Sequence, residues 1–148
     1  MKDSWHIRKA VPEDSDGLRR CMESAYTPYL ERMNGIHLPP MDLDYSSEIR
    51  DFPTWVVQHE GMIVGGLTMV FGSDRASIAN IAVHPRMQGR GIGGDLMKFA
   101  ELKAKEKEYS ELRLTTHVLL TENVSLYLHL LWTEFDRDDV RVHMKKKI

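Results

Sequence analysis

The chain has 148 residues, the length of one domain that buries about two thirds of the surface its unfolded form exposes. Hydrophobic residues make up 42% and charged residues 28% of the sequence, which excludes a disordered or fibrous protein. The formal net charge of -2 gives no global positive field, so we expect neither nucleic acid nor a membrane as partner. We expect a single domain over residues 1–148, as a monomer or homodimer.

Cysteine usage and hydropathy bear on the compartment. Cys21 is the only cysteine, so no disulfide can form within the chain. No apolar run reaches the roughly 18 residues that a membrane span needs, and the start of the sequence lacks the apolar core of a signal peptide. These features predict a cytoplasmic protein.

The first fifty residues predict a strand, a helix and an irregular segment. Residues 5–10 alternate apolar and polar side chains, as a strand does. A helix is expected from Pro12, with an apolar stripe at helical spacing made of Leu18, Cys21, Met22 and Ala25. The stripe predicts that Cys21 is a small core residue and not a nucleophile. Prolines interrupt residues 27–53, where a short helix is expected at residues 44–50.

The remaining pattern predicts strands at residues 55–59, 62–71 and 76–83, with a hairpin turn at Glu60-Gly61. The clearest helix covers residues 91–108, with Ile92, Leu96, Phe99 and Ala100 on its apolar face. A strand at residues 111–117, a helix at 122–131 and a last strand at 140–146 follow. This order predicts an α+β, or mixed α/β, fold in which helices pack on a mixed sheet.

A glycine-rich run joins the strand at residues 76–83 to the clearest helix. Residues 88–94 are Gln-Gly-Arg-Gly-Ile-Gly-Gly. Glycines let the backbone approach a phosphate and adopt positive φ, while the free N–H groups and dipole of a helix start favour an anion. Arg90 can add a charge-assisted contact. The alternative is a tight turn that only lets the helix pack on the sheet; the density of glycines favours phosphate binding.

Three kinds of phosphate ligand compete for this run. Gly89, Gly91 and Gly94 fit the G-x-G-x-x-G spacing of dinucleotide-binding folds. Such folds need an acidic residue after the next strand to hold the ribose, and the stretch there is Leu-Thr-Thr-His at residues 114–117. A P-loop would end in Gly-Lys-Ser/Thr, which is absent.

Residues 88–93 resemble the acetyl-CoA signature Gln/Arg-x-x-Gly-x-Gly/Ala of the GNAT superfamily of N-acetyltransferases. The similarity extends to residues 7–10, 63–65, 81–85 and 123–132, and thus to most of the chain, although residues 27–53 match nothing. The resemblance implies an acyl-CoA N-acyltransferase fold, with a largely antiparallel sheet of six to seven strands and about four helices. It also implies acetyl-CoA as co-substrate, and no metal.

The same resemblance assigns roles to individual residues. It implies that the backbone at residues 81–83 pairs with the pantetheine arm and polarises the carbonyl. Tyr127, four residues after Asn123, would protonate the leaving thiolate; the alternative is a half-buried packing residue. The expected CoA-binding residues are Ile81, Ala82, Val83, Gln88, Gly89, Arg90, Gly91, Ile92, Gly93, Gly94 and Asn123.

Two departures from the family pattern affect the expected chemistry. Leu131 replaces a glycine, and because leucine resists a positive φ, the sequence leaves open whether the helix exit and the aim of Tyr127 are kept. The inward strand position where some members place a glutamate or histidine holds Ser77 or Ala79. We therefore expect proton removal through ordered water, held by Asn80, His84 and His117.

The sequence thus predicts direct acetyl transfer from acetyl-CoA to a primary amine of a small molecule or protein. Residues expected to line a pocket for a cationic amine are Tyr26, Tyr29, Glu31, Asp42, Asp44 and Tyr45. Because the base is missing and Leu131 departs from the pattern, a non-catalytic acyl-CoA-binding sensor domain is the alternative. A nucleotide-binding module is the third hypothesis.

Overall fold

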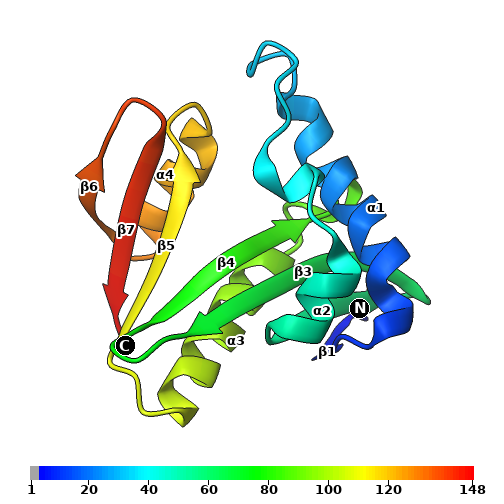
Figure 1. Cartoon of the computed structure of the whole chain (residues 1–148), viewed down its shortest axis with the longest axis horizontal. Coiled ribbons are helices and arrows are strands. Elements are labelled where there is room, and N and C mark those ends of the chain that lie inside the picture. Colours follow the sequence, from blue (N-terminus) through cyan, green and yellow to red (C-terminus); the bar gives the residue numbers. More distant parts are fainter. Residues whose placement is uncertain (1–3) are drawn as a thin grey trace.

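One seven-stranded sheet forms the centre of the protein, seen in the computed structural model of Figure 1, which describes residues 4–148. The strand order is β1-β2-β3-β4-β5-β7-β6, and all neighbours are antiparallel except β4 and β5, which are parallel. The predicted α+β class with a mixed, largely antiparallel sheet is confirmed. The strands are β1 (His6–Lys9), β2 (Thr54–His59), β3 (Met62–Phe71), β4 (Ala76–Val83), β5 (Glu111–His117), β6 (Thr133–Arg137) and β7 (Arg141–Lys147).

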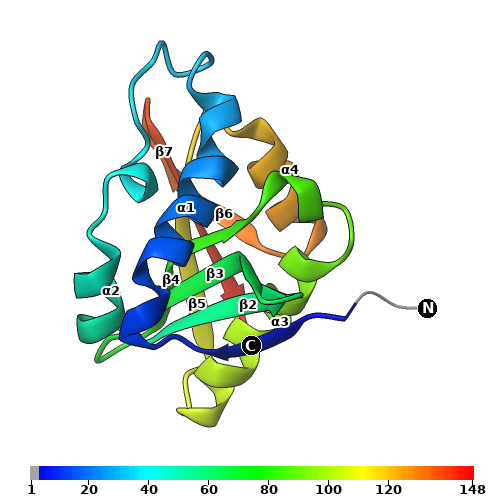
Figure 2. The same cartoon turned by 90° about the vertical axis from the view of Figure 1, so that its right-hand side faces the viewer.

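Helices cover both faces of this sheet. Helices α1 and α2 lie on one face, and α3 and α4 lie on the other (Figures 1 and 2). Their bounds are α1 (Ser15–Tyr26), α2 (Tyr45–Asp51), α3 (Ile92–Glu106) and α4 (Thr121–His129). Short 3-10 turns cover Pro12–Asp14, Thr27–Tyr29, Pro39–Met41 and Pro85–Met87. Within the described residues, no helix combines the length and apolarity needed to cross a membrane.

Helix α1 packs on the sheet through the predicted stripe. Leu18, Cys21, Met22 and Ala25 are all buried. A Cβ at Gly66 of β3 would lie 2.5 Å from Leu18 Cδ1, so a larger residue there would force the α1 side chains to shift. Burial raises the pKa of the Cys21 thiol to about 12, as expected for an inert core cysteine.

The larger core lies between α3 and the opposite face of the sheet. Helix α3 contributes Ile92, Leu96, Met97, Ala100 and Ala104, and the strands contribute residues such as Leu67, Met69, Leu112, Val142 and Met144. The predicted apolar face of this helix is confirmed except at its edge, where Phe99 is half-buried against the Trp55 ring, with ring centroids 5.4 Å apart.

Local sequence patterns predicted the tight hairpin turn correctly but did not predict one edge strand. The predicted hairpin at Glu60 and Gly61 is present, with φ of 50° and 78°, the conformation that matches the twist of the flanking strands. Strand β6 was not predicted. Four of its five side chains are exposed, so it has no apolar alternation, and it joins the sheet only through pairing with β7.

Candidate active site

A gap opens in the sheet between β4 and β5. The two strands pair only from Ala76 to Ile78, and they then diverge in a V (Figure 1). Next to this point, the pairing of β4 with β3 skips one residue and leaves Ala79 unmatched. Such a bulge bends a strand and ends its pairing. The second half of β4 therefore presents an unpaired edge inside the sheet.

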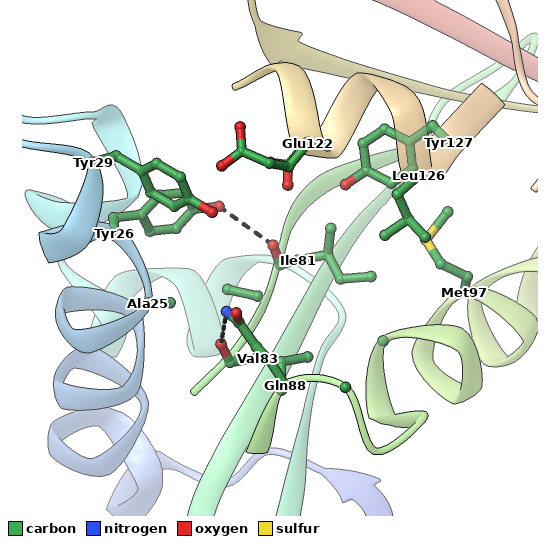
Figure 3. Close-up of a pocket in the computed structure, with 14 residues that line it drawn as sticks. Ala25, Tyr26, Tyr29, Ile81, Val83, Gln88, Met97, Glu122, Leu126 and Tyr127 are labelled. Carbon is green, nitrogen blue, oxygen red and sulfur yellow. Dashed lines mark hydrogen bonds between the residues drawn. The ribbon is translucent and has the colours of Figure 1, made fainter. Parts of the chain in front are cut away.

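Two peptide groups of this edge face the gap. Tyr26 donates a hydrogen bond of 3.3 Å from its hydroxyl to the carbonyl of Ile81, and Gln88 Nε2 donates one of 3.1 Å to the carbonyl of Val83 (Figure 3). In an extended strand paired on its other side, the N–H and C=O of one residue point the same way. The N–H groups of Ile81 and Val83 therefore also point into the gap.

The glycine-rich loop follows β4 and leads into α3. Gly89 and Gly91 have φ of 80° and 98°, so both occupy the left-handed region that favours glycine. A Cβ placed on Gly89, Gly91 or Gly94 would meet no atom within 4 Å, so the space above the loop and the first helical turn is open. First-turn N–H groups have no acceptor within their helix. This geometry is that of an anion site with room for a phosphate.

Cavity A, of about 290 Å³, lies between this loop, the edge of β4, and helices α1 and α4 (Figure 3). Its lining includes the predicted residues Ile81, Ala82, Val83, Gln88, Gly89, Gly93, Asn123 and Tyr127. Four further predicted residues do not line it: Arg90, Gly91, Ile92 and Gly94. The side chain of Ile92 is buried in the core, so only its backbone is available at the helix start.

Tyr127 projects from α4 into this cavity. Its side chain is 8% exposed, and its hydroxyl points toward β4 and Ile81 (Figure 3). The hydroxyl forms no hydrogen bond with any residue in the described part of the chain. Burial raises the pKa of Tyr127 to about 12, so the phenol stays protonated at neutral pH and is able to donate.

The helix exit beyond Tyr127 answers a question that the sequence left open. Leu131 adopts a φ of 73°, although leucine is expected to resist it. Leu131 N–H donates to the Leu128 carbonyl at 3.1 Å and Trp132 N–H donates to the Tyr127 carbonyl at 2.9 Å, the two bonds of a Schellman motif. Trp132 is buried, and its packing holds the strained leucine in place. Leu131 therefore does not turn Tyr127 away from the cavity.

Cavity B, of about 410 Å³, lies beside cavity A and shares with it Tyr26, Ile81, Asn123 and Tyr127. Its walls come from β4, from residues 114–117 of β5 and from the segment between α1 and α2, and α2 contributes Glu48. Tyr127 and Ile81 thus stand where two separate cavities meet, as a group transfer between two bound molecules requires.

Cavity B contains two of the three polar residues predicted to hold water, Asn80 and His117. Asn80 is the buried polar residue of β4, with 6% of its surface exposed. His117 lines the cavity, with its Nδ1 accepting the Leu119 N–H at 3.1 Å. His84 lines neither cavity, because its Nδ1 caps the following turn by accepting the Arg86 N–H at 3.2 Å.

The acidic residues predicted for the acceptor pocket lie elsewhere. Asp44 caps α2 by accepting the N–H groups of Ser46 and Ser47, Asp42 pairs with His37, and Glu31 lines neither cavity. Tyr45 is buried behind the wall, whereas Tyr26 and Tyr29 line cavity A. No pattern in the sequence indicates Glu48, since one glutamate on a short helix resembles any solvated charge.

The irregular segment reaches across the gap to α4. Arg32 donates to both carboxylate oxygens of Glu122, at 2.6 and 3.2 Å, and to the Leu119 carbonyl at 2.9 Å. These hydrogen bonds lower the pKa of Glu122 to about 2. Met33, Leu38 and Leu120 are buried together below this contact. The segment thus contributes lining residues to both cavities.

Comparisons with known proteins identify the family. Residues 18–131 match the model of the acetyltransferase (GNAT) family. The uncharacterized N-acetyltransferase YjgM of Escherichia coli (strain K12) is 26% identical over 138 residues, which cover 88% of this chain and 83% of that protein. The chain therefore belongs to the GNAT family, as the glycine-rich run indicated, and it is an N-acetyltransferase.

Solved structures show the same fold. The PaiA N-acetyltransferase of Thermoplasma acidophilum, solved in complex with coenzyme A, has a TM-score of 0.86 at 21% identity, covering 98% of this chain and 99% of that one. The ribosomal-protein-S18-alanine N-acetyltransferase of Escherichia coli has a TM-score of 0.79 at 16% identity, covering 98% and 94%. The acyl-CoA N-acyltransferase type predicted for this sheet is thereby confirmed.

Proposed function

We propose that the protein transfers an acetyl group directly from acetyl-CoA to a primary amine, with the CoA moiety in cavity A and the amine in cavity B. The observation that carries this proposal is the position of Tyr127 and Ile81, which line both cavities. Direct transfer needs the two reacting groups to meet in one orientation, and a shared wall provides that meeting point.

The residues around cavity A fit the donor. The open first turn of α3 and the loop containing Gln88, Gly89, Arg90, Gly91 and Ile92 would hold the diphosphate, together with Gly93 and Gly94. The N–H groups of Ile81 and Val83 would pair with the pantetheine amides, so that the arm lies along β4 as an added strand, beside Ala82. Asn123 at the far wall would fix the thioester end.

Two groups of this chain would act on the reacting thioester. The Ile81 N–H, which points into the gap, would donate to the carbonyl oxygen as negative charge develops on it. The Tyr127 hydroxyl would give its proton to the departing sulfur. Its raised pKa keeps the phenol protonated until the sulfur becomes charged, so its position matters more than its acidity.

The acceptor must reach the carbonyl as a neutral amine. An alkylamine with a pKa of ~10.4 is almost entirely protonated at pH 7, which costs roughly 4 kcal/mol unless the site removes the proton. Ordered water bound by Asn80 and His117 in cavity B would carry this proton away. The acceptor is an amine of a small molecule or of a protein.

Calorimetric titration tests the choice of donor. Acetyl-CoA and CoA should bind, whereas NAD and ATP should not. Tight binding of NAD without binding of CoA would make the protein a nucleotide-binding module. Binding of acetyl-CoA without turnover of any amine would support a non-catalytic sensor domain.

A further inference from the structure

Cavity B is lined by Asn80 and Glu48, and each has a side-chain acceptor that receives no hydrogen bond from residues 4–148. We propose that Asn80 and Glu48 form the binding site for the ammonium group of an aliphatic amine acceptor, and that Glu48 receives the proton of that ammonium before acetyl transfer. This inference rests on the proposed function and assigns its base.

Asn80 is held in a fixed orientation. Its Nδ2 donates to the Tyr45 hydroxyl at 3.1 Å, and that hydroxyl donates to the Pro40 carbonyl at 2.5 Å. The chain of donors leaves Asn80 Oδ1 buried with no partner among the described residues. An unpaired buried oxygen of this kind costs about 1–3 kcal/mol, which a ligand N–H or a water would recover.

Glu48 stands on the same side of α2 as Tyr45, three residues later along the helix. Asp44 fixes the start of this helix by capping it. The Glu48 carboxylate forms no hydrogen bond or ion pair with any residue from 4 to 148, although it lines the cavity. Burial, and then the charge of Asp51, raise the pKa of Glu48. A raised pKa brings a carboxylate closer to the operating pH of a useful base.

The surroundings of Glu48 favour a cation with an apolar body. On its own helix, the charge of Asp51 acts on Glu48, and Arg50 is paired with Asp51; Arg141 and His117 also line the cavity. The hydroxyls of Tyr26 and Tyr127 remain protonated, because burial raises both pKa values. Carbon chains would lie against an apolar wall made of Leu38, Pro39, Leu43 and Leu120.

Glu48 and Tyr127 account for every proton that moves in the reaction. An N–H bond of the ammonium breaks and its proton passes to the Glu48 carboxylate, directly or through one water. The neutral nitrogen then forms the N–C bond as the C–S bond breaks, and Tyr127 protonates the sulfur. The phenolate regains a proton from the acetylated nitrogen. Glu48 finally releases its proton to solvent, so one proton is released for each acetyl group transferred.

Glu48→Gln tests this role with two acceptors of different basicity. The substitution keeps the size and hydrogen-bonding reach of the side chain but removes its charge. For an alkylamine at pH 7, kcat/KM should fall about 100-fold, the usual contribution of a general base. For an arylamine, which is already neutral at pH 7, kcat/KM should change less than about threefold, because no proton has to be removed first. The acid limb of the pH profile should also disappear.

Glu31→Gln is the matched control. It makes the same chemical change, but at an exposed glutamate that lines neither cavity. Its kcat/KM should match the wild type, and all three proteins should bind CoA equally in calorimetry. Equal losses for alkylamine and arylamine, or an unchanged alkylamine rate, would overturn the role of Glu48. A wild-type protein that acetylates no amine would instead overturn the proposed function.

Discussion

The backbone carbonyl of Tyr127 accepts a hydrogen bond of 2.9 Å from the backbone N–H of Trp132, across the strained residue Leu131. This bond forms part of the C-terminal cap of α4, in the turn that follows Tyr127, and Tyr127 lines both cavities. The buried Trp132 ring lies 6.1 Å from the Tyr127 ring, centroid to centroid. The position of Tyr127 thus depends on a helix cap in which Leu131 adopts a left-handed conformation.

Replacing Leu131 with glycine should therefore stabilise the fold. Leu131 is 78% exposed, so the substitution removes little packing while it relieves a left-handed strain of about 1–2 kcal/mol. The greater freedom of glycine in the unfolded chain offsets part of this gain, which leaves a net of about 0.5–1 kcal/mol. Urea unfolding measures the change. A loss of stability would mean that Leu131 makes an apolar contact that outweighs its strain.

Gly94→Ala separates stability from donor binding. Its Cβ would meet no atom, and its φ is not in the left-handed region, so alanine should raise helix stability by about 0.5 kcal/mol. The same methyl group would intrude where the diphosphate approaches the first turn of α3. Loss of one charge-assisted hydrogen bond should raise the Kd for CoA at least about tenfold. An unchanged Kd would place the diphosphate elsewhere.

The pH dependence of stability should reflect Asp14. Arg8 donates to both of its carboxylate oxygens, at 2.8 and 2.9 Å, and the Val11 N–H donates a third hydrogen bond at 2.8 Å. The hydrogen bonds from Arg8 lower the pKa of Asp14. A carboxyl with a lowered folded-state pKa stabilises the fold above its unfolded value of ~3.9, and this stability is lost as pH falls through the folded pKa.

Asp14→Asn should accordingly lower the free energy of unfolding by about 1–2 kcal/mol at pH 7, because charge-assisted hydrogen bonds are lost from a mostly buried group. As pH falls below about 4 and through the lowered pKa of the folded state, the difference from the wild type should shrink, because the carboxyl becomes protonated first in the unfolded chain and then in the folded one. Urea unfolding at both pH values gives the comparison. A difference that stays constant with pH would show that the Asp14 charge contributes nothing.

Cys21→Ala should leave turnover intact. The thiol is buried, and its raised pKa keeps it protonated, so it cannot carry the acetyl group. The smaller side chain should cost about 1 kcal/mol of stability. Thiol release from acetyl-CoA is the readout. Lost turnover in a variant that still folds and binds CoA would exclude direct transfer.

Local patterns in the sequence were enough for most of the fold. The glycines at residues 89 and 91 predicted positive φ because few other residues adopt it, and the stripe of α1 predicted its buried face. Strand β6 was not predicted, because an exposed edge strand needs no apolar alternation. The left-handed conformation of Leu131 was not predicted either, because the buried Trp132 imposes a conformation that leucine itself disfavours.

On the acceptor side of the site, Tyr26, Asn80 and His117 were expected from the sequence, whereas Glu48 and its closeness to Asn80 were not. Asn80 comes from β4 and Glu48 from α2, and only the fold brings both to cavity B. Nothing in the local sequence separates Glu48, which lines the cavity, from Asp44, which caps the same helix. Spacing along the chain could locate the donor loop because all of its groups are contiguous, whereas the acceptor site combines distant segments.

The most direct test of the central claim is the release of free thiol from acetyl-CoA across a panel of amines, with wild type and Tyr127→Phe compared at equal CoA saturation. Phenylalanine keeps the packing against Trp132 and removes only the hydroxyl. We predict that the wild type acetylates at least one amine and that kcat for that amine falls about 100-fold in the variant, with CoA affinity unchanged. A variant that turns over as fast as the wild type would contradict the account.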